Sequence, residues 1–155
     1  MTFDTAFSLV VGEEGGLADD PRDPGGLTKF GISQRQYPDV DIRALTIDDA
    51  KALYQRDYWH PVHGDDLPRP WALSVFDTAV NMGVGTAIRL MQDALGVMVD
   101  GKLGPRTITA ARDADNRKLA RFYALRAIRY AENPNFKTYG YGWLTRSFVM
   151  AMESS

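Results

Sequence analysis

The feature that most constrains the fold is a helical repeat of apolar residues, which runs through most of the chain and is interrupted over residues 15–33. At the N-terminus, apolar residues recur at helical spacing between Phe3 and Val11, which predicts a helix that ends at Glu13 or Glu14 before a pair of glycines. The interruption is rich in glycine, proline and aspartate. Turn-rich segments of about twenty residues in small domains are usually functional or form short hairpins.

The helical pattern returns after this interruption and continues to the C-terminus. Further helices are expected from Thr46 onward and at about residues 73–83, 86–95, 107–112, 116–132 and 143–152. The longest of them is the one at 116–132. Strand signals are sparse, and residues 28–32 are a candidate for one short strand. The sequence therefore predicts a mainly helical domain with a small irregular or β-like lobe near the N-terminus.

Composition excludes several classes of site. The 155 residues contain no cysteine, which excludes disulfide frameworks, cysteine nucleophiles and thiolate metal sites. The net charge is −2, but residues 1–100 hold 8 basic and 16 acidic side chains, whereas residues 101–155 hold 10 and 4. This asymmetry favours an anionic partner for the C-terminal third. No apolar run reaches membrane-spanning length, and the N-terminus lacks the basic region of a signal peptide.

Glu14, Asp23 and Thr28 form the first candidate site. A carboxyl group at the C-terminal end of an apolar helix is expected to have a raised pKa, because burial and the helix dipole both disfavour its charge. Such a group can donate a proton as a general acid. Asp23 would be an ionised second carboxylate and Thr28 would hold a water, which is the set of groups that glycosidic cleavage needs. The alternative is a surface glutamate and a turn-capping aspartate.

Several sequence motifs together resemble glycoside hydrolase family 108, the phage-type N-acetylmuramidases with an E-G-G-Y motif and a D-P-G-G-x-T-x-x-G-I loop. The matching segments are residues 14–17, 20–33, 58–59, 76–83, 100–107 and 142–146. The resemblance implies a lysozyme-like fold, with a catalytic lobe at 1–93 and a helical peptidoglycan-binding module at 94–155. Leu17 departs from the motif, since the family usually has an aromatic residue there, and Glu13 stands where the family often has histidine.

The resemblance also implies an activity, which is hydrolysis of the bond between N-acetylmuramic acid and N-acetylglucosamine in peptidoglycan. Glu14 occupies the position of the family's essential glutamate, with Asp23 and Thr28 as further candidate catalytic groups. The expected biology is that of an endolysin that lyses bacteria, is made in a host cytoplasm and reaches the wall after release by a holin. The alternative function is a non-catalytic peptidoglycan-binding, effector or structural protein.

Four residues are candidates for contact with the sugar strand. Tyr58 and Trp59 could stack on sugar rings, although Tyr58 also fits the apolar stripe of a helix, which makes a core position its alternative. Asp77 and Asn81 share one helix face because they are four residues apart. The alternative for Asp77 and Asn81 is a buried polar pair that fastens the helix to a loop.

The helix expected at 116–132 is basic, and its side chains are candidates for contact with anionic wall polymers. The four residues assigned to this role are Arg117, Lys118, Arg121 and Arg129. The alternative is a solvated charged face. A zinc site at His60 and His63 is a weak alternative because no third ligand is fixed. The sequence thus predicts a monomer that binds peptidoglycan, without metal, cofactor, nucleic acid or membrane insertion.

Overall fold

The computed structural model describes residues 1–12, 16–19 and 26–154, and it divides the chain into two compact units, Thr2–Asp57 and Tyr58–Ser155. Each unit is described by itself below. The boundary predicted at residue 93 separates a catalytic lobe from a binding module, not two compact units, and it stays a prediction.

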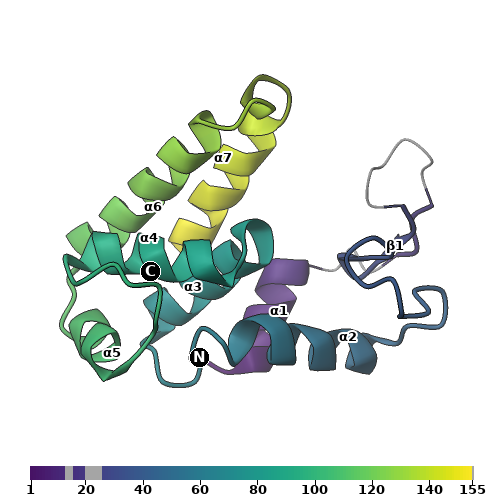
Figure 1. Cartoon of the computed structure of the whole chain (residues 1–155), viewed down its shortest axis with the longest axis horizontal. Coiled ribbons are helices and arrows are strands. Elements are labelled where there is room, and N and C mark those ends of the chain that lie inside the picture. Colours follow the sequence, from purple (N-terminus) through teal and green to yellow (C-terminus); the bar gives the residue numbers. More distant parts are fainter. Residues whose placement is uncertain (13–15, 20–25, 155) are drawn as a thin grey trace. The chain divides into compact units, whose positions relative to one another are not determined.

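The first unit begins with helix α1, Phe3–Val11 (Figure 1). The Thr2 side chain accepts a hydrogen bond from the backbone N–H of Thr5 and so caps the helix. Gly12, at φ 70°, is the C-cap residue of α1, and the predicted end at Glu13 or Glu14 lies outside the described residues.

A β-hairpin forms where the sequence predicts a single short strand. Strand β1, Thr28–Lys29, pairs antiparallel with β2, Ile32–Ser33. The two residues between them, Phe30 and Gly31, have φ angles of 50° and 73°. Positive φ at both central residues is the geometry of the tight turn that joins twisted strands. The single strand predicted at residues 28–32 is too short for its hydrophobic pattern to reveal the turn that it contains.

Helix α2, Ile47–Tyr54, starts with a capping box in which Thr46 and Asp49 satisfy each other's backbone N–H groups. It continues into a π-helical turn, Gln55–Trp59. Within the first unit, Phe7 of α1 packs edge-on against Tyr54 of α2, with ring centroids 5.3 Å apart.

The second unit is built around helix α3, whose residues Trp71–Ala79 are all buried. A helix that is covered on every side forms the centre of a core. Helices α4 and α7 pack on α3, and α6 packs on both α4 and α7 (Figure 1). The helices of this unit are α3, Arg69–Met82; α4, Val84–Leu95; α5, Pro105–Arg112; α6, Asn116–Ala131; and α7, Phe136–Ser154.

The longest described helix is α7, which begins seven residues before the predicted start and has 19 residues against 16 in α6. Gly140 and Gly142 obscured this extension, because glycine disfavours helix interiors. At Gly140 the absent side chain leaves room for the Phe136 ring, which a β-carbon would approach to 2.6 Å. In the described part of the chain, no helix has the length and hydrophobicity needed to cross a membrane.

Gly64 is a sensitive point of the second unit. A β-carbon there would overlap the indole of Trp59, which is fully buried. Because a rigid buried ring cannot move aside, we expect Gly64→Ala to lower the free energy of unfolding by about 1–3 kcal/mol, the usual cost of overpacking. The measurement is urea-induced unfolding.

Gly142→Ala is the matched control. Its added β-carbon meets open space within a helix, so the exchange should stabilise the protein by roughly 0.5–1 kcal/mol. Equal stability of the two variants would contradict the packing argument.

Candidate functional site

Two of the three predicted catalytic groups, Glu14 and Asp23, lie outside the described residues. The third, Thr28, lies on β1, where its backbone N–H and C=O pair with Ala18 at 2.8 Å each. Its hydroxyl donates a hydrogen bond to the carbonyl of Gly26 at 3.2 Å and is half-buried. The hydroxyl oxygen can still accept a hydrogen bond from water. The predicted role of Thr28 therefore stays a prediction, with a geometry that is compatible with it.

Trp59 and Tyr58 have different surroundings although they are adjacent. The indole of Trp59 is fully buried, donates from Nε1 to Asp65 at 3.0 Å and packs edge-on against Phe76. An indole face enclosed in this way is not available to a sugar ring. Tyr58 is half-buried. The predicted aromatic contact is thus corrected for Trp59, which is a core residue in this structure, and stays a prediction for Tyr58.

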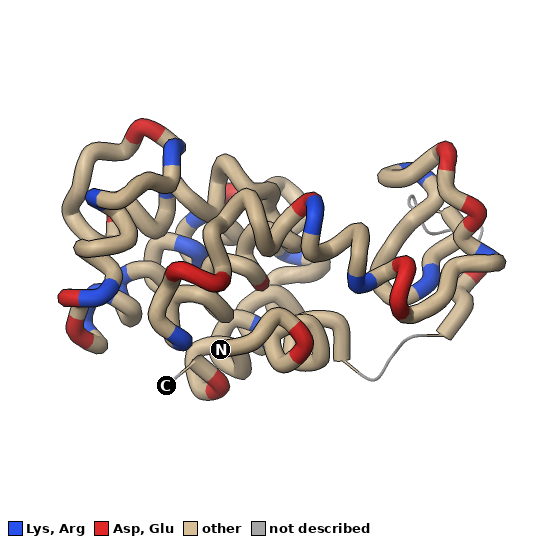
Figure 2. Tube along the Cα trace, turned by 90° about the horizontal axis from the view of Figure 1, so that it is seen from below, with Lys and Arg blue, Asp and Glu red and all other residues tan. Residues whose placement is uncertain are grey.

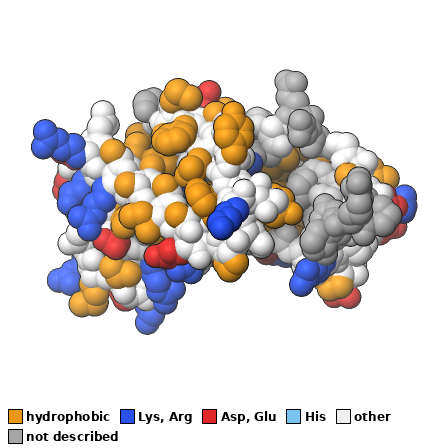
Figure 3. Space-filling model, turned by 90° about the horizontal axis from the view of Figure 1, so that it is seen from above, with side chains coloured by type: hydrophobic (Ala, Val, Ile, Leu, Met, Phe, Trp, Pro, Cys, Tyr) orange, Lys and Arg blue, Asp and Glu red, His pale blue; other side chains and the backbone are white. Residues whose placement is uncertain are grey.

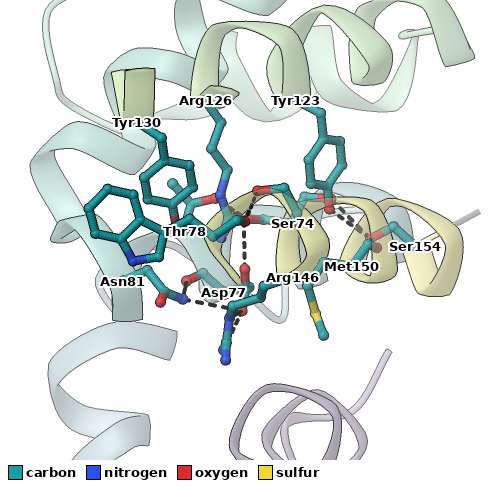
Figure 4. Close-up of polar contacts among 12 residues, drawn as sticks. Ser74, Asp77, Thr78, Asn81, Tyr123, Arg126, Tyr130, Arg146, Met150 and Ser154 are labelled. Carbon is teal, nitrogen blue, oxygen red and sulfur yellow. Dashed lines mark hydrogen bonds and ion pairs between the residues drawn. The ribbon is translucent and has the colours of Figure 1, made fainter. Parts of the chain in front are cut away.

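Asp77 of α3 lies at the centre of a buried ionic cluster (Figure 4). One carboxylate oxygen accepts from Arg126 of α6 at 2.5 Å, and the other from Arg146 of α7 at 2.6 Å. The side chains of Asp77 and Arg126 have no solvent exposure, and that of Arg146 is 33% exposed. With both oxygens engaged, Asp77 is buried and polar as its alternative interpretation predicts, but it fastens its helix to two other helices and not to a loop.

Arg126 is held by more than its ion pair. Its guanidinium also donates to the hydroxyls of Thr78 at 3.0 Å and Tyr130 at 3.1 Å. Burial lowers the pKa of Arg126, but the Asp77 carboxylate and Tyr130 raise it more, so the net direction is upward. The guanidinium stays charged.

Arg126 and Arg146 are the residues of this cluster that sequence reasoning missed. Arg126 belongs to the basic helix expected at 116–132, where a charged side chain ordinarily faces solvent. The signal against this was its spacing, since Phe122, Arg126 and Tyr130 are four residues apart and share one helix face. All three are buried.

Asn81 lies one turn after Asp77 and donates to its backbone carbonyl at 2.8 Å. Its side chain lines a polar cavity of about 260 Å³ within the second unit, which we call the Asn81–Trp143 cavity. The cavity is lined by Asn81, Met82, Thr86, Arg129, Tyr130, Asn133 and Trp143. Two predicted contact residues, Asn81 and Arg129, thereby meet at one hollow although they are 48 positions apart in the sequence.

The four basic residues assigned to wall binding differ in their surroundings. Arg121 pairs with Asp93 at 2.8 Å, and the Lys118 ammonium donates to the carbonyl of Leu95 at 3.1 Å. Arg117 and Arg129 make no ion pair within the described residues, and both are exposed. Figure 2 shows basic and acidic segments interspersed along the chain. Of the four residues, only Arg129 lines a described cavity.

Two larger hollows of the second unit have other characters. One, of about 680 Å³, borders the loop at Asp100 and Lys102, where the buried Gln92 amide bonds to both residues. The other, of about 490 Å³, is an apolar groove between α6 and α7 that includes Leu144 and Phe148. Figure 3 shows hydrophobic side chains lying next to one another on the face that it displays. Nothing in the structure shows what covers this groove.

His63 lies 3.0 Å from a carboxylate oxygen of Asp66. Within residues 1–12, 16–19 and 26–154, no three histidine or acidic side chains come together in a way that could hold a metal ion. The weak zinc alternative at His60 and His63 therefore gains no third ligand from the described residues.

We expect Asp77→Asn to lower the free energy of unfolding by about 3–5 kcal/mol, because it leaves two arginines without their shared carboxylate in a buried setting. Thermal and urea unfolding measure this loss. Asn81→Ala, which removes a single partly buried hydrogen bond, should cost about 1 kcal/mol. A stable Asp77→Asn protein with weakened substrate binding would instead assign Asp77 to the substrate.

Comparison with known proteins identifies two family models along the chain. Residues 7–83 match the model described as Glycosyl hydrolase 108, and residues 86–148 match a predicted peptidoglycan domain. Among solved structures, that of Brucella abortus SagA is similar, with 30% identity and a TM-score of 0.86. The match covers 98% of this chain and 92% of SagA. No curated protein matches the chain.

Proposed function

Because this chain belongs to glycosyl hydrolase family 108, we propose that it cleaves the glycan strand of peptidoglycan between N-acetylmuramic acid and N-acetylglucosamine. The chain is a lysozyme-type glycoside hydrolase of peptidoglycan with a mainly helical, lysozyme-like fold. These findings confirm the family, fold class and reaction class expected from the motifs.

The observation that carries the proposal is the order of the two family regions. A glycosyl hydrolase region comes first and a peptidoglycan domain follows after two residues. A single chain therefore combines hydrolysis of a glycosidic bond with recognition of the bacterial wall polymer. Glycan cleavage is the one reaction that uses both.

Glu14 is the proposed general acid, since it occupies the glutamate position of the E-G-G motif in the matched region. Its carboxyl group protonates the glycosidic oxygen as the bond between that oxygen and the anomeric carbon breaks. A water then adds to the anomeric carbon and loses a proton to a base. Asp23 and Thr28 are the proposed groups that hold this water, Thr28 through its hydroxyl oxygen.

The proposed biological role is lysis of bacteria by an endolysin-like enzyme. Peptidoglycan is its partner, and the enzyme acts as a monomer at the cell wall after holin-dependent release from the cytoplasm. We place its action at the cell wall because its substrate, peptidoglycan, lies outside the cytoplasmic membrane.

Digestion of purified sacculi should produce new reducing ends at muramic acid, because the proposed bond joins muramic acid to the following glucosamine. Borohydride reduction followed by mass spectrometry identifies the reduced sugar. New amino termini in the digest, in place of reducing ends, would assign the chain to the amidases or peptidases.

Glu14→Gln should lower lytic activity by roughly 10²–10⁴-fold or more, because the amide cannot donate the proton. Clearing of permeabilised Gram-negative cells measures the rate. Glu13→Gln is the matched control on the neighbouring residue and should retain most activity. Equal activity of the two variants would remove Glu14 from the proposed role.

A further inference from the structure

The Asn81–Trp143 cavity is composed almost entirely of groups that can form hydrogen bonds. Its lining comes from the C-terminal ends of α3 and α6, the start of α4 and the middle of α7, together with Asn133, which follows α6. These four elements belong to one compact unit and pack on one another. The cavity is therefore a feature of the packed helices.

Aromatic rings form one wall of the cavity. Tyr130 and Trp143 stack with centroids 5.0 Å apart and an interplanar angle of 21°, and Tyr139 approaches the same indole at 5.9 Å. Because the rings of Tyr130 and Tyr139 both lie against its indole, Trp143 is a rigid part of this wall. No described residue accepts a hydrogen bond from the indole N–H, so this donor is available to a ligand.

Arg129 supplies an available cation. Its guanidinium makes no ion pair or hydrogen bond with any described residue, in contrast to Arg121, which pairs with Asp93 on the same helix. The guanidinium presents a planar fork of donors that matches a carboxylate. Glu132 does not line this cavity; it lines an adjacent shallow hollow that shares Arg129 and Asn133.

The buried cluster next to the cavity adds to the positive potential. Asp77 faces two arginines, so the cluster carries one more positive than negative charge. It connects to the cavity wall through Arg126, whose guanidinium donates to the Tyr130 hydroxyl and lies 5.5 Å from the Tyr130 ring centroid. Charge in a partly desolvated setting acts over a longer range than at an exposed surface.

We propose that the Asn81–Trp143 cavity binds a carboxylate of peptidoglycan, with Arg129 as its cation and the Asn133 amide as a neighbouring donor. This inference rests on the proposed function, since it takes the polymer as given and names the part of it that is bound. Peptidoglycan offers carboxylates from two sources, the peptide stem and the lactyl group of muramic acid where the stem is absent. The test distinguishes these two sources.

The experiment titrates the full-length protein with three probes that contain no glycosidic bond between sugars, so hydrolysis cannot intervene. They are the sugar-free stem tetrapeptide, free N-acetylmuramic acid and, as a neutral probe, N-acetylglucosamine. Binding is followed by two-dimensional NMR at low salt, with the indole N–H of Trp143 as a local reporter. At least one carboxylate probe should bind more tightly than N-acetylglucosamine, and the one that does identifies the source.

Arg129→Gln should weaken binding of that probe by roughly tenfold, the usual scale for a hydrogen bond to a charged group. Arg112→Gln is the matched control, because Arg112 is an exposed arginine of the same unit, on α5, that lines no described cavity and has no role assigned in wall binding. It should change binding less than twofold. Arg129→Lys keeps the charge and should fall between the wild type and Arg129→Gln.

Asn133→Asp provides a second, independent variant. The side-chain oxygen of Asn133 accepts from the backbone N–H of Asn135 at 2.9 Å, and a carboxylate can keep this bond. The added negative charge beside Arg129 should nevertheless weaken binding of a carboxylate probe and leave a neutral probe unaffected.

The alternative role of Arg129 is to compensate the dipole at the C-terminal end of α6. In that case Arg129→Gln would lower the melting temperature and weaken probe binding no more than Arg112→Gln, which would overturn the inference. Failure of both carboxylate probes to bind would overturn it as well.

Digestion of sacculi by the wild type tests the proposed function separately. Normal hydrolysis with unchanged probe binding in Arg129→Gln would reject only the cavity inference. Absent hydrolysis with Arg129-dependent binding would reject only the hydrolase.

Discussion

The arrangement of the second unit depends on one interaction, the pairing of the buried Asp77 carboxylate with two arginines. A buried charge is strongly unfavourable unless it is paired and hydrogen-bonded, and here the two pairing groups come from α6 and α7. The three helices can therefore satisfy this charge only in one mutual arrangement. Asn81, one turn further along α3, is placed by the same constraint at the edge of the Asn81–Trp143 cavity.

The central helix also joins the two family regions physically. Helix α3 belongs to the region that matches glycosyl hydrolase 108, whereas its packing partners α4 and α7 belong to the peptidoglycan domain. The peptidoglycan domain thus completes its hydrophobic core with α3, a helix of the glycosyl hydrolase region. This explains why the compact units divide near residue 57, although the family models meet near residue 85.

The basic residues of α6 show how packing separates side chains of equal charge. Arg126 lies on the face that α6 turns to α3 and is enclosed, while Arg121 and Lys118 bind a carboxylate and a helix-end carbonyl of α4. Arg129 lies in the last turn of the helix and lines the cavity. Net charge alone describes none of these differences, because it takes no account of which groups face a partner.

The sequence alone determined the helical class, most helix positions and the family, because apolar periodicity and the turn-rich glycosidase motifs are local features. It also marked Glu14, Asp23 and Thr28 as candidates. Tertiary structure decided that Trp59 is buried, that Asp77 binds two arginines, and that Asn81 and Arg129 share one cavity. These outcomes depend on contacts between residues far apart in the chain, which local patterns do not encode.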